Sequence, residues 1–320
     1  MITSTAKLSS TSRLPLSRAR AASSDGKSIF DHLEDPKATG TLPSLKSVLS
    51  ELQTLTQKSS TRLEEVTKLV QVDQGMSLRV LRMANSVYYA PSEPIMDVQD
   101  AILYIGLSTF RGAVASTRCI EKTCHIEQSV LDWKEFWTHA AGVGQITMEL
   151  SRHLLHPGMA EESFYLMGLL HDIGKVVLAH VMPDDFNQIY MQAALERKSP
   201  AALEVARLGV DHGQLGAWYL DKQGISVQLC EPVRFHHAPV IENQPHSNHA
   251  VLIRLADMLA RRFELGQSGN CEDVNDPFKS TEWATFLAQV HELNAHGDKL
   301  QMEITKKIGG ISDLVRKIIV

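Results

Sequence analysis

The sequence predicts an all-α fold of two helical lobes, and three observations support this prediction. Apolar residues recur at helical spacing, as Leu166, Leu169, Leu170 and Ile173 do at i, i+3, i+4 and i+7. Proline and glycine, which end helices, separate the segments that have this spacing. No stretch of the first lobe alternates apolar and polar residues in the way that a half-buried strand does.

The composition is typical of a soluble globular protein. The chain has 320 residues, of which 43% are hydrophobic and 22% charged, and this length is enough for two lobes with their own cores. The net charge of -5 argues against a general nucleic-acid binder. No apolar run approaches the roughly 18–20 residues that a membrane span needs. The four cysteines form no C-x-x-C pair, which favours a reducing cytoplasm over a disulfide framework or a zinc ribbon.

Residues 1–30 differ from the rest of the chain. Serine, threonine and alanine dominate there, and five basic residues stand against one acid, a net charge of +4. The remainder has 27 basic against 36 acidic residues, a net charge of -9. We interpret the segment as a disordered basic tail. A targeting presequence is the alternative, because such segments are also rich in arginine and serine and poor in acids.

The first lobe is expected over about 40–125. Pro43 suits a first helical position, Thr61 and Glu64 have the spacing of a capping box, and Gly106 suits the end of a helix. In order, the expected helices run over about 43–55, 61–70, 77–88, 98–105 and 108–120.

The second lobe is expected over about 131–265, followed by a C-terminal helical extension over 266–320. Its helices are expected over about 133–143, 162–175, 186–195, 200–208 and 250–263, and a further one closes at a histidine pair, 236–237. The extension has a loop over about 266–276 and then two or three helices. It carries no recognisable chemistry.

The stretch 162–175 carries the most informative residues of the chain. On one helix His171 and Lys175 would be i,i+4 neighbours, and Asp172 and Lys175 i,i+3 neighbours. An imidazole, a carboxylate and an ammonium would then meet on a mostly buried helix. Buried charge is costly unless it is paired or bound to a metal. These groups therefore either pair with polar groups elsewhere in the chain or hold a metal ion and an anion.

Several segments resemble the HDOD domain, a helical module related to the HD phosphohydrolases. The stretch 69–86, ending in L-R-M-A-N-S, is similar to the N-terminal part of that domain, although Gln74 replaces the usual proline of a D-P-x-L start and Met76 the leucine. The stretch 209–220, which begins G-V-D-H-G-Q-L-G, resembles a second family pattern. Asn85 is either a ligand contact or a structural residue that caps or bridges helices. We favour the structural role, because buried asparagines usually satisfy backbone groups.

The resemblance also implies a set of metal ligands. The order H, then H-D, then D matches the HD superfamily, and it implies that His139, His171, Asp172 and Asp257 bind one divalent ion. Three further histidines and an acid resemble the expanded metal site of HD-GYP phosphodiesterases: His212, His236, His237 and Glu135. Nitrogen and carboxylate ligands suit iron, manganese, zinc or magnesium, and no organic cofactor is expected. In an active hydrolase Asp172 and Lys175 would be the catalytic residues, with Lys175 neutralising phosphate charge.

Two features favour other interpretations of the same residues. The sequence after His237 lacks the Gly-Tyr-Pro loop with which HD-GYP proteins hold their cyclic dinucleotide, so hydrolysis of cyclic-di-GMP is not expected. The polar side chains could also form a buried network without metal, since both arrangements need the same residue types.

The resemblance implies a cytoplasmic bacterial signalling or regulatory protein that acts by binding a signalling partner. The polar pocket would then sense a metal or a nucleotide, or serve as structure. The alternative is a metal-dependent phosphohydrolase that acts on a nucleotide or another phosphate ester. Neither nucleic acid nor a membrane is expected as a partner, and the sequence does not indicate the oligomeric state.

Overall fold

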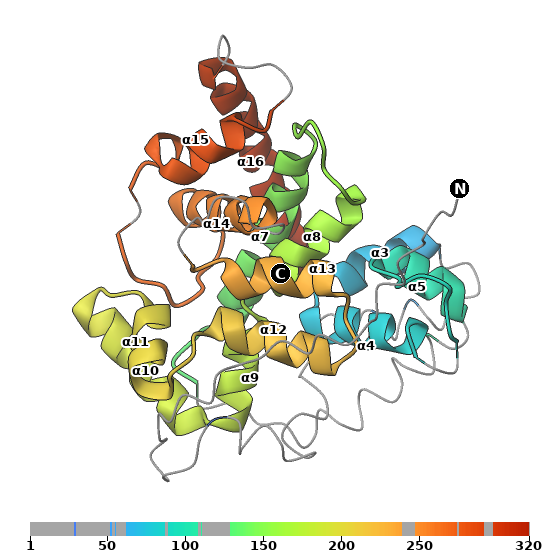
Figure 1. The fold of residues 1–320 in the computed structure, drawn as a ribbon, viewed down its shortest axis with the longest axis horizontal. Helices are drawn as coiled ribbons and strands as arrows, with labels where there is room; N and C mark the ends of the chain where they lie inside the picture. The colour runs from blue at the N-terminus through green and yellow to red at the C-terminus, as the bar shows by residue number, and fades with distance from the viewer. Residues whose placement is uncertain are drawn as a thin grey trace, which may run out of the picture.

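The protein is helical throughout the part that the structure describes (Figure 1). The computed structural model describes residues 62–86, 89–107, 110, 129–238, 247–273, 275–290 and 297–319, together with Ile29, Leu52 and Leu55. Within these residues there is no strand, and one isolated bridge joins Leu154 to Val290. The all-α prediction is therefore confirmed. The expected helices over 43–55 and 108–120 and the tail over 1–30 lie almost entirely outside the described residues.

The N-terminal helices α3 (Leu63–Gln71), α4 (Gln74–Ala84) and α5 (Val98–Ile105) pack against one another at one side of the molecule (Figure 1). Asp73 caps α4 by accepting a hydrogen bond from the backbone N–H of Met76 at 2.8 Å. This cap starts α4 three residues before the expected position, and the helix ends at Ala84. Gly106, with φ of +82°, ends α5 as expected.

Two sequence interpretations in this region have different outcomes. Asn85 does bridge two segments, because its amide donates to the carbonyl oxygens of Leu81 and Ile95 and accepts from the Ile95 N–H. These bonds confirm the structural role, since Asn85 caps the end of α4 and joins it to the segment before α5. The expected capping box of Thr61 and Glu64 stays a prediction: within the described residues α3 begins at Leu63, and its N-cap residue Arg62 makes no side-chain capping bond. Thr61 lies outside the described residues.

The helices that follow enclose the stretch 162–175, which holds His171, Asp172 and Lys175. They are α7 (Trp133–Ser151), α8 (Glu161–Leu170), α9 (Ile173–Val181), α10 (Pro183–Glu196), α11 (Pro200–Leu208), α12 (His212–Lys222), α13 (Val227–Phe235) and α14 (Ser247–Arg262). Helix α7 packs against α8 and α14, and α12 packs against α9 and α13. The start of α7 is fixed by Asp132, whose side chain accepts hydrogen bonds from two backbone N–H groups of the first turn. Helices α10 and α11 lie on the side away from α3–α5 (Figure 1).

The expected single helix over 162–175 is wrong: the chain turns at His171 and Asp172. Helix α8 ends at Leu170 and α9 begins at Ile173. The turn brings Gly174 against α12, so closely that a Cβ on Gly174 would stand 1.9 Å from the carbonyl oxygen of His212. The close approach of two helix backbones therefore decides the geometry of this stretch.

The apolar stretch Ser163–Val181 is also longer than the sequence analysis allowed. Its length and composition would suffice to cross a membrane, but 89% of it is buried inside the protein. It contains the turn between α8 and α9. These properties are those of a core segment.

The C-terminal part consists of η1 (Pro277–Lys279), α15 (Thr281–Leu287) and α16 (Gly297–Ile319). This agrees with the expected loop followed by helices. Helix α16 packs along α7, where Lys307 forms an ion pair with Glu149. Helix α16 thus packs on the helix that carries His139, whereas α15 packs on α14.

Candidate metal centre

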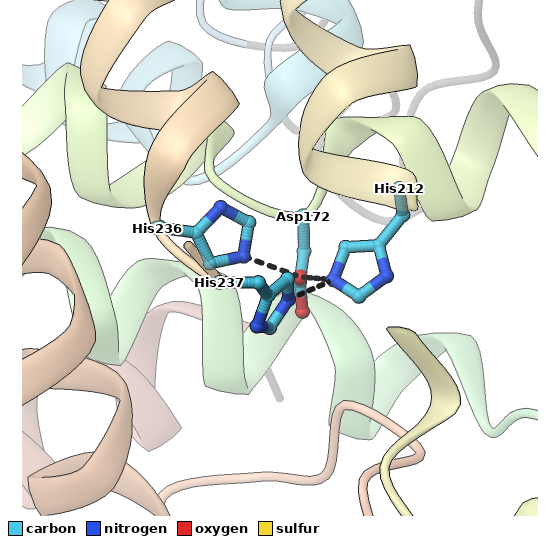
Figure 2. Close-up of side chains that lie close together, drawn as sticks. All are labelled: Asp172, His212, His236 and His237. Carbon is cyan, nitrogen blue, oxygen red and sulfur yellow. Dashed lines mark hydrogen bonds and ion pairs between the residues drawn. The ribbon is translucent and has the colours of Figure 1, made fainter. Parts of the chain in front are cut away.

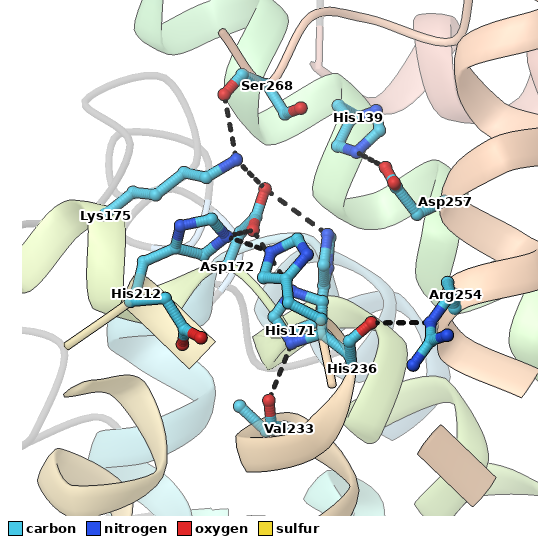
Figure 3. A network of polar contacts seen from close by, with 12 residues as sticks. His139, His171, Asp172, Lys175, His212, Val233, His236, Arg254, Asp257 and Ser268 are labelled. Carbon is cyan, nitrogen blue, oxygen red and sulfur yellow. Dashed lines mark hydrogen bonds and ion pairs between the residues drawn. The ribbon is translucent and has the colours of Figure 1, made fainter. Parts of the chain in front are cut away.

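Eight predicted residues lie close together inside the protein (Figures 2 and 3). Five elements supply them: α7, the α8–α9 turn with the start of α9, the first residue of α12, the end of α13, and α14. We call this group the His/Asp centre, and its members are His139, His171, Asp172, Lys175, His212, His236, His237 and Asp257. Six of them are buried, and His237 and Asp257 are half-buried.

Asp172 lies at the middle of the centre. Its Oδ2 is 2.6 Å from Nζ of Lys175 and 3.3 Å from Nε2 of His171. Its Oδ1 is 3.0 Å from Nε2 of His212 and 3.9 Å from Nε2 of His236 (Figure 2). Both carboxylate oxygens therefore face nitrogen atoms. The ammonium of Lys175 also donates to the carbonyl oxygen of Ser268 at 3.0 Å.

The histidine rings are held so that Nε2 points inward. Nδ1 of His171 is 2.7 Å from the carbonyl oxygen of Gly168, and Nδ1 of His236 is 2.6 Å from that of Val233. A carbonyl oxygen only accepts, so each Nδ1 donates a hydrogen to it, and Nε2 of each ring is the nitrogen that faces the centre. This second contact on the outer nitrogen is the usual support of a metal-binding histidine.

Some of the inward nitrogen atoms have no hydrogen-bond partner within the described residues. Neither ring nitrogen of His139 has one, although its Nε2 lies 3.0 Å from Oδ1 of Asp257. Nε2 of His236 also has none. Nε2 of His212 and Nε2 of His237 lie only 2.7 Å apart. Buried polar atoms are rarely left in this state, and a cation among them would satisfy them.

The donor atoms form two groups of the size that a metal ion requires. The first contains Asp172, His212, His236 and His237, and the second His139, His171 and Asp172, with ligand atoms within 4.8 Å of one another in each group. Asp172 belongs to both groups. Imidazole nitrogen with carboxylate oxygen fits zinc, iron or manganese, so these residues suit a divalent ion.

The charges within the centre favour the ligand forms of its residues. Burial alone would raise the pKa of Asp172, but His171 and Lys175 hold it well below its usual value. Burial and the neighbouring His171 and His212 lower the pKa of His236 to about 3. Burial likewise lowers the pKa of His237. Asp172 is thus ionised and His236 neutral at neutral pH, which are the forms that bind metal.

His212 differs from the other histidines. Burial would lower its pKa, but Glu204 and Asp172 raise it to about 9. In the metal-free protein His212 therefore holds a proton at neutral pH. A bound cation would take the place of that proton.

The cavity at the centre is small. Its volume is about 10 Å³, close to the minimum that holds one water molecule. The cavity is also lined by the start of α11, at Ser199 and Pro200, and by the loop after α14, at Ser268 and Asn270. This space suits an ion and is far below the 300–1,000 Å³ that is typical of small-molecule pockets.

Two acids, Glu135 and Glu204, do not lie where the sequence analysis led us to expect. Glu135 lies one turn before His139 on α7, is half-buried, and belongs to neither ligand group nor to the cavity lining. Glu204 was not predicted, yet it is fully buried against His212. A signal for it exists, because Ala201, Glu204 and Leu208 share the buried stripe of α11.

Solved structures share this fold at low sequence identity. The MmoQ response regulator of Methylococcus capsulatus str. Bath gives a TM-score of 0.60 at 22% identity, over 69% of this chain and 86% of that chain. An HDOD domain protein of unknown function from Geobacter sulfurreducens gives a TM-score of 0.53 at 22% identity, over 87% and 94% of the two chains. At these identities the likeness establishes the fold alone.

Sequence comparison supports the resemblance noted above. An uncharacterized protein of Treponema pallidum (strain Nichols) is 23% identical over 223 residues, which are 69% of this chain and 40% of that protein. This chain therefore spans less than half the length of that relative. The family model of the HDOD domain matches residues 42–239, which is more than half of the 320 residues, and the chain belongs to the HDOD family.

Proposed function

We propose that this protein is a cytoplasmic signalling module whose His/Asp centre binds a divalent metal ion and whose output is contact with a partner protein. The observation that carries the metal is the set of inward Nε2 atoms around ionised Asp172, two of which, on His139 and His236, have no hydrogen-bond partner among the described residues. The cavity of about 10 Å³ accepts an ion and excludes a nucleotide in this conformation.

Membership of the HDOD family supports the regulatory role. One protein of similar fold is named a response regulator, and all the relatives described above are bacterial. A buried centre that joins five elements also suits such a role, because an ion bound there would hold those elements together. The bound state and the free state would then present different surfaces or different stability to a partner.

Elemental analysis of protein purified without chelator or nickel affinity tests the metal. We expect one or more equivalents of iron, manganese or zinc, lost in Asp172→Ala. Asp185→Ala is the matched control, because Asp185 is an equally buried aspartate that pairs with Arg207 outside the centre. A folded wild-type protein that holds no metal and gains no thermal stability from added ions would contradict the proposal.

A phosphohydrolase is the second candidate, and Lys175 is the observation in its favour. Its buried ammonium lies 2.6 Å from Asp172, the residue shared by the two ligand groups. Two ions that share a carboxylate would polarise a phosphoryl oxygen and lower the pKa of a water molecule. Lys175 would offset the charge of the phosphate, and the linings at 199–200 and 268–270 would have to move aside to admit it.

A screen of phosphate esters with the metal-loaded protein tests this candidate. We expect turnover to disappear in His171→Ala and to fall strongly in Lys175→Ala, while both variants keep the helical circular dichroism signal. Turnover that survives His171→Ala would come from another protein in the sample and would rule the candidate out.

A further inference from the structure

Glu204 is the most completely enclosed acid next to the centre. Its side chain is 0% exposed. Its Oε2 accepts from the backbone N–H of His212 at 2.7 Å and lies 2.7 Å from Nδ1 of the same residue. Its Oε1 accepts from the hydroxyl of Tyr190 at 2.9 Å. Both oxygens are therefore used, and the carboxylate has a single position.

These contacts fix the ring of His212 at its outer nitrogen. An oxygen that already accepts from a backbone N–H also accepts from Nδ1–H, so Nε2 of His212 is the nitrogen that faces Asp172. The outer nitrogen atoms of His171 and His236 rest instead on neutral carbonyl oxygens, at Gly168 and Val233. Among the described contacts, His212 is the histidine of the centre whose Nδ1 rests on a carboxylate. A charged acceptor makes an imidazole more basic and a stronger ligand.

The acid is in turn held by a rigid support. Tyr190 is 3% exposed, and its ring stacks on Phe186 at 4.3 Å between centroids. Glu204 lies on α11 and Tyr190 on α10. Two helices that contribute no residue to the His/Asp centre thus hold the position of one of its ligands.

We infer that Glu204, supported by Tyr190, is a positioning residue that orients His212 and strengthens its bond to the divalent ion of the centre. This inference rests on the metal site proposed above. It assigns to α10 and α11 a role in metal affinity that the ligand residues alone do not reveal. Removing the outer partner of a metal-binding histidine typically weakens metal affinity by about 10–100-fold.

The test compares metal affinity in a set of variants of the full chain. Dissociation constants for Zn²⁺ and Mn²⁺ are measured by competition with a chromophoric chelator, and the visible absorption of the Co²⁺-loaded protein reports the ligand geometry. We expect Glu204→Ala to weaken Zn²⁺ binding by about 10–100-fold and to change the Co²⁺ spectrum. Glu204→Gln keeps an acceptor for His212 without the charge, so its loss should be smaller. Tyr190→Phe should lose the least.

Glu149→Ala is the matched control for stability. Glu149 is also a buried acid with ion pairs, but it lies near the other end of α7 from His139. We expect it to lower the melting temperature without changing either the Zn²⁺ dissociation constant or the Co²⁺ spectrum. If Glu204→Ala does not fold, the Zn²⁺ dissociation constants and Co²⁺ spectra of Glu204→Gln and Tyr190→Phe are compared with those of the wild-type protein instead.

The outcomes separate this inference from the proposal beneath it. If the wild-type protein binds no divalent ion, both are wrong. If the wild-type protein binds Zn²⁺ and the Glu204 variants bind it equally tightly with the same Co²⁺ spectrum, the metal site stands and the role of Glu204 is overturned. A graded loss from Tyr190→Phe through Glu204→Gln to Glu204→Ala, absent in Glu149→Ala, supports it.

Discussion

Lys175 shows how a single buried charge depends on its partners. It is 2% exposed, and its ammonium contacts Asp172 and the carbonyl oxygen of Ser268. Lys175→Met keeps the length of the side chain but leaves the carboxylate without its nearest cation. Breaking a buried ion pair costs about 3–5 kcal/mol, and we expect the free energy of unfolding in chelator to fall by that amount in urea titrations.

The control for this prediction is an exposed pair. Lys198 is 61% exposed and pairs with Glu196 at 2.8 Å, so Lys198→Met should leave the free energy of unfolding almost unchanged, because water screens an exposed pair. Equal effects of the two substitutions would show that the pair of Lys175 and Asp172 adds no more to the free energy of unfolding than an exposed pair does. Because a bound divalent ion would also neutralise Asp172, the loss in Lys175→Met should shrink when Zn²⁺ is added.

The individual residues of the centre differed in how far the sequence revealed them. His171, Asp172 and Lys175 stand out because they interrupt an otherwise apolar run. Glu204 stands out less: its spacing from Ala201 and Leu208 places it on one helix face, but an acid on a short helix usually faces solvent, and its burial depends on the position of α12. Glu135 has the right spacing from His139, but spacing does not decide which neighbour covers a side chain. Burial set by tertiary contacts is the information that the sequence alone lacked.

At the scale of the elements, the contact of α9 with α12 sets the position of His212. A Cβ on Gly174 would meet backbone atoms of α12, at 1.9 Å from His212 O and 2.8 Å from Gly216 N. Backbone atoms cannot give way as a flexible side chain does, so Gly174→Ala must push the helices apart. We expect a loss of about 3 kcal/mol or more in the free energy of unfolding, measured in urea, together with weaker Zn²⁺ binding.

The same substitution on α16 provides the comparison. Gly310 has open space around its Cα, and alanine there gains about 0.5–1 kcal/mol from helix propensity. Gly310→Ala should therefore raise the melting temperature and leave Zn²⁺ binding unchanged. A stable Gly174→Ala variant with normal metal affinity would show that the tight contact between α9 and α12 is not needed.

The contact between α7 and α16 should depend on pH. Burial would raise the pKa of Glu149, but Lys307 and Arg152 lower it below its ordinary value of 4.5. A lowered pKa in the folded state means that the stabilisation is present above about pH 4.5 and is lost as the pH falls through the folded value. We expect Glu149→Gln to cost about 1 kcal/mol at pH 7 and progressively less below pH 4.5, in thermal melts from pH 7 to pH 3. A cost that stays constant over that range would contradict the ion pairs.

The boundaries of the helices could be predicted where a local signal existed. Asp132 and Gly106 mark a start and an end that the structure keeps. The break at His171 and Asp172 could not be predicted, because the apolar spacing from Leu166 to Ile173 continues across it. It arises from the packing of Gly174 on α12, and no local pattern records such a contact. Periodicity predicts the buried face of a helix but not where packing interrupts it.

At the scale of the whole molecule, two hydrogen bonds tie the N-terminal helices to the stretch that leads into the centre. The hydroxyl of Tyr165 on α8 donates to the carbonyl oxygen of Gln71 at 2.6 Å. The amide of Gln74 donates to the carbonyl oxygen of Leu169, two residues before His171. Gln74 stands where the family usually has proline, and its amide makes a bond that proline could not. The N-terminal helices are thus connected to the end of α8 that positions His171.

Tyr165→Phe tests whether this connection transmits order across the molecule. The substitution leaves the Gln71 carbonyl oxygen without its partner, which costs about 1–3 kcal/mol when the acceptor stays buried. We expect faster amide hydrogen exchange in peptides from α3 and α4 and a smaller increase at α8, both measured by mass spectrometry.

Tyr219→Phe is the control, because Tyr219 is equally buried at 3% exposed and its hydroxyl makes no hydrogen bond that the described residues reveal. If exchange rises evenly over all helices in Tyr165→Phe, the hydroxyl supports global stability only. An increase confined to α3, α4 and α8 would show that the N-terminal helices and the approach to the centre open as one unit, which is the coupling that a signal passing between them requires.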